Sequence, residues 1–252
     1  MNIRAVSAWL AVLWLAAAPA AGASLVNRSV DHAPFDALLK AHVRDGLVDY
    51  RGLAQDREAL ETYLALVAAA HPDYWDRTDQ LAFWLNAYNA CALRSVLEQP
   101  PAHSVQEING FFDRMRCSVG SRDLTLQQIE AEARKVGDWR VRIAAARPAV
   151  GGPWLRGEAY AADRLEAQLD EQARQFLADP VSGARVKDDV LWVSAIFKER
   201  PKELVKGRVT AETLLGLLRP WLPPVFDRVN SMALQLKWIP FDWTLNASSR
   251  PQ

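Results

Sequence analysis

Apolar residues recur every three or four positions along much of this chain, which is the spacing that places them on one face of a helix. The spacing predicts helices at residues 35–43, 60–67, 81–97, 162–177 and 212–222. Segment 81–97 is apolar on almost every side, which indicates a helix buried at the centre of the fold. Thr125 and Gln128 have the pattern of a capping box, so a further helix is expected to begin after Thr125.

Shorter segments have the patterns of strands. Residues 116–124 and 185–193 each predict a β-hairpin, with turns at Gly120 and at 187–189. Residues 234–238 alternate like a strand, and the apolar run 141–146 suits a short buried strand. Helices outnumber strands, so the expected fold class is α+β, as a mainly helical single domain with a small β-sheet or hairpins.

The N-terminus has the order of a secretory signal peptide. Arg4 precedes an apolar run at 5–18, and small residues stand at 21–23. The alternative is a transmembrane anchor, but the run is shorter than the roughly 20 residues of a bilayer span. We therefore expect residues 1–23 to be cleaved and residues 24–252 to form one periplasmic or secreted domain, without a membrane span.

The charge balance bears on partners. The chain has 30 Lys and Arg against 30 Asp and Glu, a formal net charge of zero. The predicted leader contains only Arg4, so its removal leaves 29 basic against 30 acidic residues. Such a balance provides neither the basic field that nucleic acid requires nor a polybasic patch for anionic lipid. Nucleic acid is therefore not expected as a partner.

The sequence lacks the residue patterns of common cofactor and metal sites. It contains no nucleophile elbow, phosphate loop, dinucleotide fingerprint or HExxH helix, and its four histidines lack zinc-ligand spacing. No cofactor and no metal are expected. Cys91 and Cys117 either form a disulfide, which an oxidising compartment permits, or serve as small buried hydrophobes.

A few polar residues stand inside strongly apolar sequence. Asn86 and Asn89 are one turn apart in the central helix, although a buried amide is unfavourable unless it is hydrogen-bonded. They either tie this helix to neighbouring loops or line a cleft that orients a substrate. Asp242 lies between two aromatic residues, so it is expected to be partly buried, with Arg140 as a candidate partner.

Four motifs together resemble the DUF547 family: FWLNAYN at 83–89, LQQIE at 126–130, PWLRGEAY at 153–160 and FDWTLN at 241–246. The resemblance runs from about Phe35 to Asn246. The family has no settled biochemical activity. Some plant and animal members carry the domain beside glutaredoxin-like domains, which implies thiol chemistry.

This chain departs from the family where that chemistry is implied. Members usually read His-Phe-Ala-Leu-x-Cys-Ala-Ser and then Cys-Pro, whereas this chain reads RIAAARPA at 142–149 and then Gly152-Pro153. The family's histidine falls on Arg142, its first cysteine on Arg147 and its second on Gly152. A guanidinium cannot replace a thiolate nucleophile, because it is a permanent cation that only donates hydrogen bonds.

Three hypotheses follow for the candidate residues Asn86, Asn89, Glu130, Arg142, Arg147 and Asp242. The favoured one is a degenerate, non-catalytic binding or accessory protein, a pseudoenzyme, whose partner is an unknown small anion held by the two arginines or another protein. The second is a hydrolase- or transferase-type enzyme with the amides and carboxylates around a remodelled pocket. The third is a structural or interaction protein whose polar residues only hold the fold. The sequence leaves the oligomeric state open.

Overall fold

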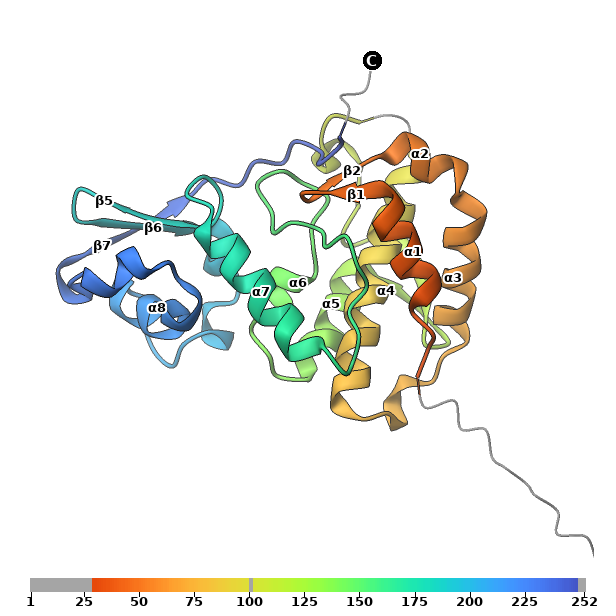
Figure 1. The fold of residues 1–252 in the computed structure, drawn as a ribbon, viewed down its shortest axis with the longest axis horizontal. Coiled ribbons are helices and arrows are strands. Elements are labelled where there is room, and N and C mark those ends of the chain that lie inside the picture. Colours follow the sequence, from red (N-terminus) through yellow and green to blue (C-terminus); the bar gives the residue numbers. More distant parts are fainter. Residues whose placement is uncertain (1–28, 100–101, 249–252) are drawn as a thin grey trace, which may run out of the picture.

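α4 (Arg77–Leu97) lies at the centre of a helical lobe (Figure 1). The computed structural model describes residues 29–99 and 102–248, and every residue from 81 to 93 is buried. The prediction of a buried central helix is therefore confirmed. The predicted leader, residues 1–23, lies outside the described residues. No described helix combines the length and the apolar character needed to cross a membrane.

The helical lobe, residues 29–164, surrounds α4 with shorter elements. α3 and α5 pack directly against α4, and α5 begins at the predicted capping box of Thr125 and Gln128. The remaining elements are antiparallel hairpins and short helices. In chain order, the lobe comprises α1 (Ala33–His42), β1 (Val43–Arg44), β2 (Leu47–Val48), α2 (Tyr50–Gln55), α3 (Arg57–Ala69), α4, β3 (Arg116–Val119), β4 (Arg122–Thr125), α5 (Leu126–Lys135) and α6 (Val141–Ala144).

The segment predicted as a buried strand, 141–146, is instead the short helix α6. The segment is buried as expected, but its backbone finds its partners within one helical turn. The Ala144 N–H donates to the Arg140 carbonyl at 2.9 Å, and the Ala145 N–H donates to the Val141 carbonyl at 2.9 Å. Buried backbone groups require such partners, and an apolar run alone does not decide between a helical turn and a strand.

A sheet lobe, residues 173–241, lies beside the helical lobe (Figure 1). The predicted hairpin is β5 (Ala184–Lys187) and β6 (Val190–Ser194), and β7 (Gln235–Ile239) pairs parallel to β6. Asp188 and Asp189 both have positive φ angles in the hairpin turn, a conformation that Asp tolerates better than most residues. α8 (Ala211–Leu218) belongs to the long connection that the parallel pairing requires.

α7 (Leu165–Ala178) joins the two hydrophobic clusters. Leu165 and Leu169 belong to the large cluster of the helical lobe, whereas Phe176 and Leu177 belong to the smaller cluster of the sheet lobe. The observed architecture is therefore the expected mainly helical α+β fold with small sheets.

After β7 the chain returns to the helical lobe and lies beside its first hairpin (Figure 1). The Val48 N–H donates to the Asn246 carbonyl at 2.8 Å, and the Asn246 side chain donates to the Gly46 carbonyl at 3.0 Å. Tyr50 donates its hydroxyl hydrogen to the Asn246 side-chain oxygen at 2.9 Å. The last described residues thus complete the structure around the first ones.

Candidate functional site

Asn86 is fully buried on α4 and binds the backbone of a distant loop. Its Nδ2 donates to the Tyr160 carbonyl oxygen at 2.8 Å, and the Tyr160 N–H donates to Asn86 Oδ1 at 2.9 Å. Both ends of the amide are thereby occupied. The loop at Tyr160 carries one of the motifs, PWLRGEAY, so the two motifs contact each other.

Asn89 does the same one turn later, with α6 as its partner. Its Nδ2 donates to the Ala144 carbonyl at 3.2 Å, and the Ala146 N–H donates to Asn89 Oδ1 at 3.0 Å. We call Asn86 and Asn89 the amide clamps. Asn89 fixes the segment between Arg142 and Arg147, and Asn86 fixes the loop at Tyr160, so both tie α4 to neighbouring segments, as the first of the two interpretations made from the sequence expected.

Arg142 lies in α6, just before the residues that Asn89 binds, and is almost completely buried, with 4% of its side chain exposed. Its Nη1 donates to the backbone carbonyls of Ile196 at 3.1 Å and Glu199 at 2.7 Å. Its Nη2 donates to the Glu203 carboxylate at 3.4 Å. Burial lowers the pKa of Arg142 because desolvation penalises the cation, and the negative charge of Glu203 opposes this effect.

Arg147 makes a bidentate pair with Glu199. The Nη1–Oε1 distance is 2.8 Å and the Nη2–Oε2 distance is 2.5 Å, the fork geometry that guanidinium and carboxylate groups favour. The guanidinium also lies over the rings of Phe241 and Trp243, 5.7 and 6.0 Å from their centroids. Burial alone would lower the pKa of Arg147, but its hydrogen bonds with Glu199 raise it overall.

Glu130 joins the same group of charges. On α5 it pairs with Arg134 at 3.4 Å and with Arg200 at 3.5 Å, and Arg134 also binds Glu203 at 2.7 Å. The structure therefore gathers three of the predicted residues, Glu130, Arg142 and Arg147, into one group of ion pairs. The Arg147–Glu199 pair is joined to the others by the hydrogen bond from Arg142 to the Glu199 backbone carbonyl. We call this set the arginine–glutamate cluster: Arg134, Arg142, Arg147, Arg200, Glu130, Glu199 and Glu203.

Asp242 does not have the expected partner. Its side chain is exposed rather than partly buried, and it accepts a hydrogen bond from the Thr244 N–H at 2.9 Å, which caps a local turn. Arg140 instead binds three carboxylates close to it, Asp138, Glu166 and Asp170. The prediction was wrong because Asp242 belongs to a turn, where short polar side chains bind the backbone two residues ahead.

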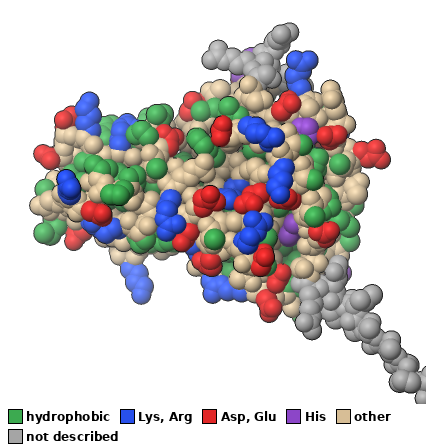
Figure 2. Space-filling model, viewed as in Figure 1, with side chains coloured by type: hydrophobic (Ala, Val, Ile, Leu, Met, Phe, Trp, Pro, Cys, Tyr) green, Lys and Arg blue, Asp and Glu red, His purple; other side chains and the backbone are tan. Residues whose placement is uncertain are grey.

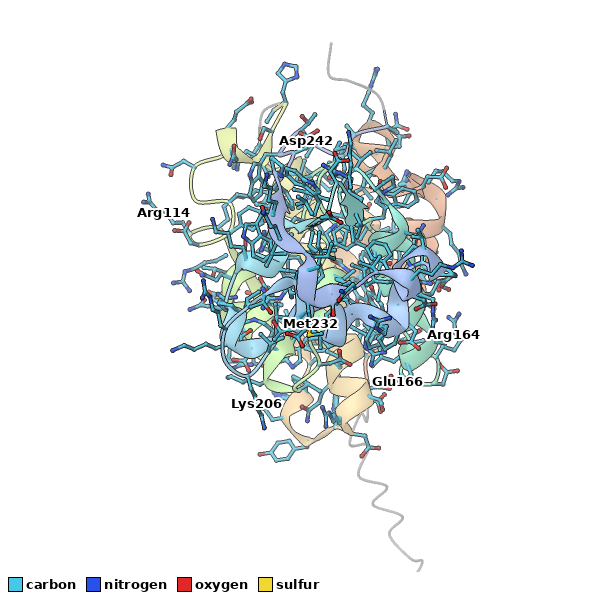
Figure 3. The ribbon with its side chains drawn as sticks, turned by 90° about the vertical axis from the view of Figure 1, so that its left-hand side faces the viewer. Arg114, Arg164, Glu166, Lys206, Met232 and Asp242 are labelled. Atoms are coloured by element: carbon cyan, nitrogen blue, oxygen red, sulfur yellow. A yellow bond between two sulfur atoms is a disulfide. The ribbon has the colours of Figure 1, made fainter. Side chains whose placement is uncertain are left out.

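Several residues of the cluster were missed by the sequence reasoning. Glu199, Arg200 and Glu203 lie in the sheet lobe, on the connection between β6 and α8, far in sequence from the four motifs. Their one signal is a dense alternation of charge, KERPKELVK at 198–206. Figure 3 shows Asp242 in the upper part of the view and Lys206, three residues after Glu203, in the lower part.

The two cysteines form a disulfide within the helical lobe. Cys91 of α4 and Cys117 of β3 are joined, with their Cα atoms 6.1 Å apart, and neither belongs to the arginine–glutamate cluster. No cysteine among residues 29–99 and 102–248 is free. In the same part of the chain no three His, Cys, Asp or Glu side chains come together in a way that could hold a metal ion.

Fold and site together define a mainly helical α+β protein in which Arg142 and Arg147 pair with carboxylates of the sheet lobe. Residues 72–177 match the family model described as "Protein of unknown function, DUF547", and this stretch of the chain is therefore a DUF547 domain. The match covers somewhat less than half of the chain. It contains both amide clamps, Glu130, Arg142 and Arg147, whereas Glu199 and Glu203 lie beyond it.

The other comparisons are narrower. A stretch of 70 residues is 37% identical to chromosome transmission fidelity protein 18 of Saccharomyces cerevisiae, covering 27% of this chain and 9% of that protein. The chain thus matches less than a tenth of the length of this relative. No solved structure matches the chain.

Proposed function

We propose that this chain is an exported, non-catalytic binding or accessory protein of the DUF547 family, and that its partner is a small organic anion. One observation carries the proposal. At the positions where the family's histidine and first cysteine fall, Arg142 and Arg147 each bind a carboxylate supplied by the sheet lobe. Guanidinium groups that bind carboxylates in this manner are suited to recognising an anion.

The cysteines support the non-catalytic part of the proposal. A sulfur atom in a disulfide is not a thiolate, and the thiolate is the nucleophile in cysteine chemistry. The disulfide also supports export, because such bonds form and persist in oxidising compartments. The signal-like order of residues 1–23 is consistent with the same route.

The competing enzyme hypothesis has less support. Glu130 is 13% exposed, and its carboxylate is already engaged in ion pairs with Arg134 and Arg200. Asp242 faces solvent and accepts a backbone hydrogen bond. The structural hypothesis accounts for the amide clamps but not for four arginines gathered around three carboxylates.

The test begins with the full-length gene expressed in a bacterium. The exported protein should be recovered from the periplasm without residues 1–23, and a thiol reagent should detect no free cysteine. A thermal-shift screen against organic acids, amines, thiols and metal ions follows. A ligand at 100 times its Kd stabilises a protein by about 2.7 kcal/mol, which such a screen detects.

The control variants are Arg147→Ala, which should abolish the stabilisation by an acid, and Arg51→Ala on the exposed surface of α2, which should not. Turnover of a thiol or acyl substrate at a rate unaffected by Arg147→Ala would contradict the non-catalytic role. Retention of residues 1–23 in the purified protein would contradict export by cleavage.

A further inference from the structure

A cavity of about 370 Å³ opens beside the arginine–glutamate cluster. Its apolar lining includes Trp139 and Leu204, and its charged lining consists of Arg134, Lys135, Asp138, Arg142 and Glu203. Cavities of this size hold small organic molecules, and their usual make-up is a mainly apolar lining with a few polar groups that fix the orientation of the ligand.

A carboxylate already lies between the two arginines. Glu203 Oε1 accepts from Arg134 Nη1 at 2.7 Å, and Glu203 Oε2 accepts from Arg142 Nη2 at 3.4 Å. The two guanidiniums are thus spaced to bind one carboxylate jointly. Glu203 belongs to a three-residue 3-10 turn, Pro201–Glu203, and 43% of its side chain is exposed, so this carboxylate reaches the arginines from the solvent side.

The arginines retain capacity for a further anion. In the described part of the chain, the Nε atom of Arg142 is buried and has no hydrogen-bond partner, whereas the Nε atom of Arg134 lies 3.4 Å from the Glu130 carboxylate. The cluster sets four guanidiniums against three carboxylates, an excess of one positive charge. A buried cation without a full set of partners is unfavourable, so a carboxylate that approaches Arg142 more closely than Glu203 does, at 3.4 Å, would be favoured.

We propose that this cavity binds the carboxylate of a small organic acid with an apolar or aromatic body, and that the acid takes the place of Glu203 between Arg134 and Arg142. The carboxylate would accept from both guanidiniums, and its body would pack against Trp139 and Leu204. The inference deepens the proposed function, on which it rests, by naming the class of anion and the residue that competes with it.

Displacement of Glu203 is compatible with its position. Its side chain is 43% exposed and comes from a short turn, so it can move into solvent. An ion pair with a partly exposed partner contributes little to stability, because water and salt compete for both charges. A ligand carboxylate that also buries an apolar body has an additional source of free energy that Glu203 lacks.

The test uses the full-length protein after export and isothermal titration calorimetry with 3-phenylpropionate as the probe. We expect Glu203→Gln to bind the probe about tenfold more tightly than the unmodified protein, since the competing carboxylate is lost. Glu212→Gln, a matched change of an exposed glutamate on α8, should leave the affinity unchanged. The uncharged 3-phenylpropionamide should not bind.

Two further variants locate the binding site. Arg142→Met in the Glu203→Gln background should abolish binding, and Arg134→Gln, at a less buried position, should weaken it at least tenfold while circular dichroism shows a folded protein. Binding that survives both changes would overturn the proposal, as would equal affinities of Glu203→Gln and the unmodified protein. Tighter binding of inorganic phosphate than of the probe would overturn the assignment to organic acids.

Failure here can be told apart from failure of the proposed function. A protein that is exported and lacks thiol turnover but does not bind the probe would refute only the assignment of this cavity. A protein that turns over a thiol substrate would refute the proposed function whatever the calorimetry shows.

Discussion

The two lobes hold their polar side chains in different ways. In the helical lobe the amide clamps are neutral, fully buried and bonded to backbone at both ends, and a disulfide joins the same helix to a hairpin. Where the sheet lobe meets the helical lobe, charged groups on exposed turns reach inward to buried arginines. Figure 2 shows mixed acidic and basic side chains across the centre of one face, and apolar side chains gathered over the sheet lobe.

This difference indicates which contacts can change. A buried amide has no alternative partner, so breaking its bonds leaves backbone groups without water or protein to bind. A carboxylate that is nearly half exposed always has water as an alternative, so it can leave its arginine at a small free-energy cost. The hydrogen bonds of the amide clamps are therefore expected to stay formed within the helical lobe. The ion pairs at the boundary between the lobes are expected to exchange partners.

The largest effect is expected from Asn86→Ala. The substitution leaves the buried N–H and carbonyl of Tyr160 unpaired and should lower the free energy of unfolding by about 4 kcal/mol, at roughly 1–3 kcal/mol for each lost partner. Urea denaturation measures this change. Asn230→Ala, on an exposed turn of the sheet lobe, is the control and should cost less than about 1 kcal/mol. A variant that loses a ligand but keeps its stability would show that the clamp is instead part of a binding cleft.

Loss of the disulfide should rank next. Replacing Cys91 and Cys117 by alanine frees a loop of 26 residues in the unfolded chain and should lower stability by about 3 kcal/mol. Thermal denaturation with and without a reductant measures the effect, and the double variant should not respond to the reductant. Because the disulfide is remote from the cluster, probe binding should persist. If the protein were equally stable with and without the disulfide, this bond would not distinguish the helical lobe from the boundary between the lobes.

A pH titration separates the lobes further. Burial lowers the pKa of His32 to about 4, against a smaller opposing effect of Asp31, and its Nδ1 contacts the Tyr63 hydroxyl at 2.8 Å. Between pH 6.5 and 4 the unfolded chain therefore binds more protons than the folded one. Stability should be fully present above pH 6.5 and should fall by roughly 3 kcal/mol towards pH 4. His32→Gln should remove this part of the pH dependence in urea denaturation. If His32→Gln left the dependence of stability on pH unchanged, that dependence would come from other titratable groups.

The smallest effect is expected at the boundary. Glu199→Gln removes the partner of Arg147, but Glu199 is 44% exposed, so the loss should be about 1 kcal/mol or less at low salt. Denaturation at low and at high salt should show the difference shrinking as ions screen the pair. A loss comparable to that of Asn86→Ala would mean that the boundary is as fixed as the interior.

Much of the fold could be predicted from sequence, because periodic burial dictates it. The central helix, the capping box at Thr125 and both hairpins depend on local patterns. The error at 141–146 arose because a short buried run satisfies a strand and a helical turn equally well, and only the contact with Asn89 decides.

The site was only half predictable. Arg142, Arg147 and Glu130 were identified from motifs within one stretch of the chain, but their partners Glu199 and Glu203 come from a connection without a motif. An ion pair between residues far apart in the sequence leaves no periodic pattern. A glutamate that pairs with a distant arginine looks, in its local sequence, like any other exposed glutamate. Asp242 shows the converse case. It stands out in the sequence, but its side chain only accepts a hydrogen bond from the backbone of Thr244, two residues later.

The return of the chain to its own beginning has a consequence for biogenesis. The first hairpin acquires its partners at Val48 and Gly46 only when Asn246 is present. A chain delivered from its N-terminus, by a ribosome or through a membrane pore, therefore has to emerge as far as Asn246 before these contacts close. Until that moment the first hairpin lacks these partners and remains open to chaperones, and the segment around Asn246 completes it.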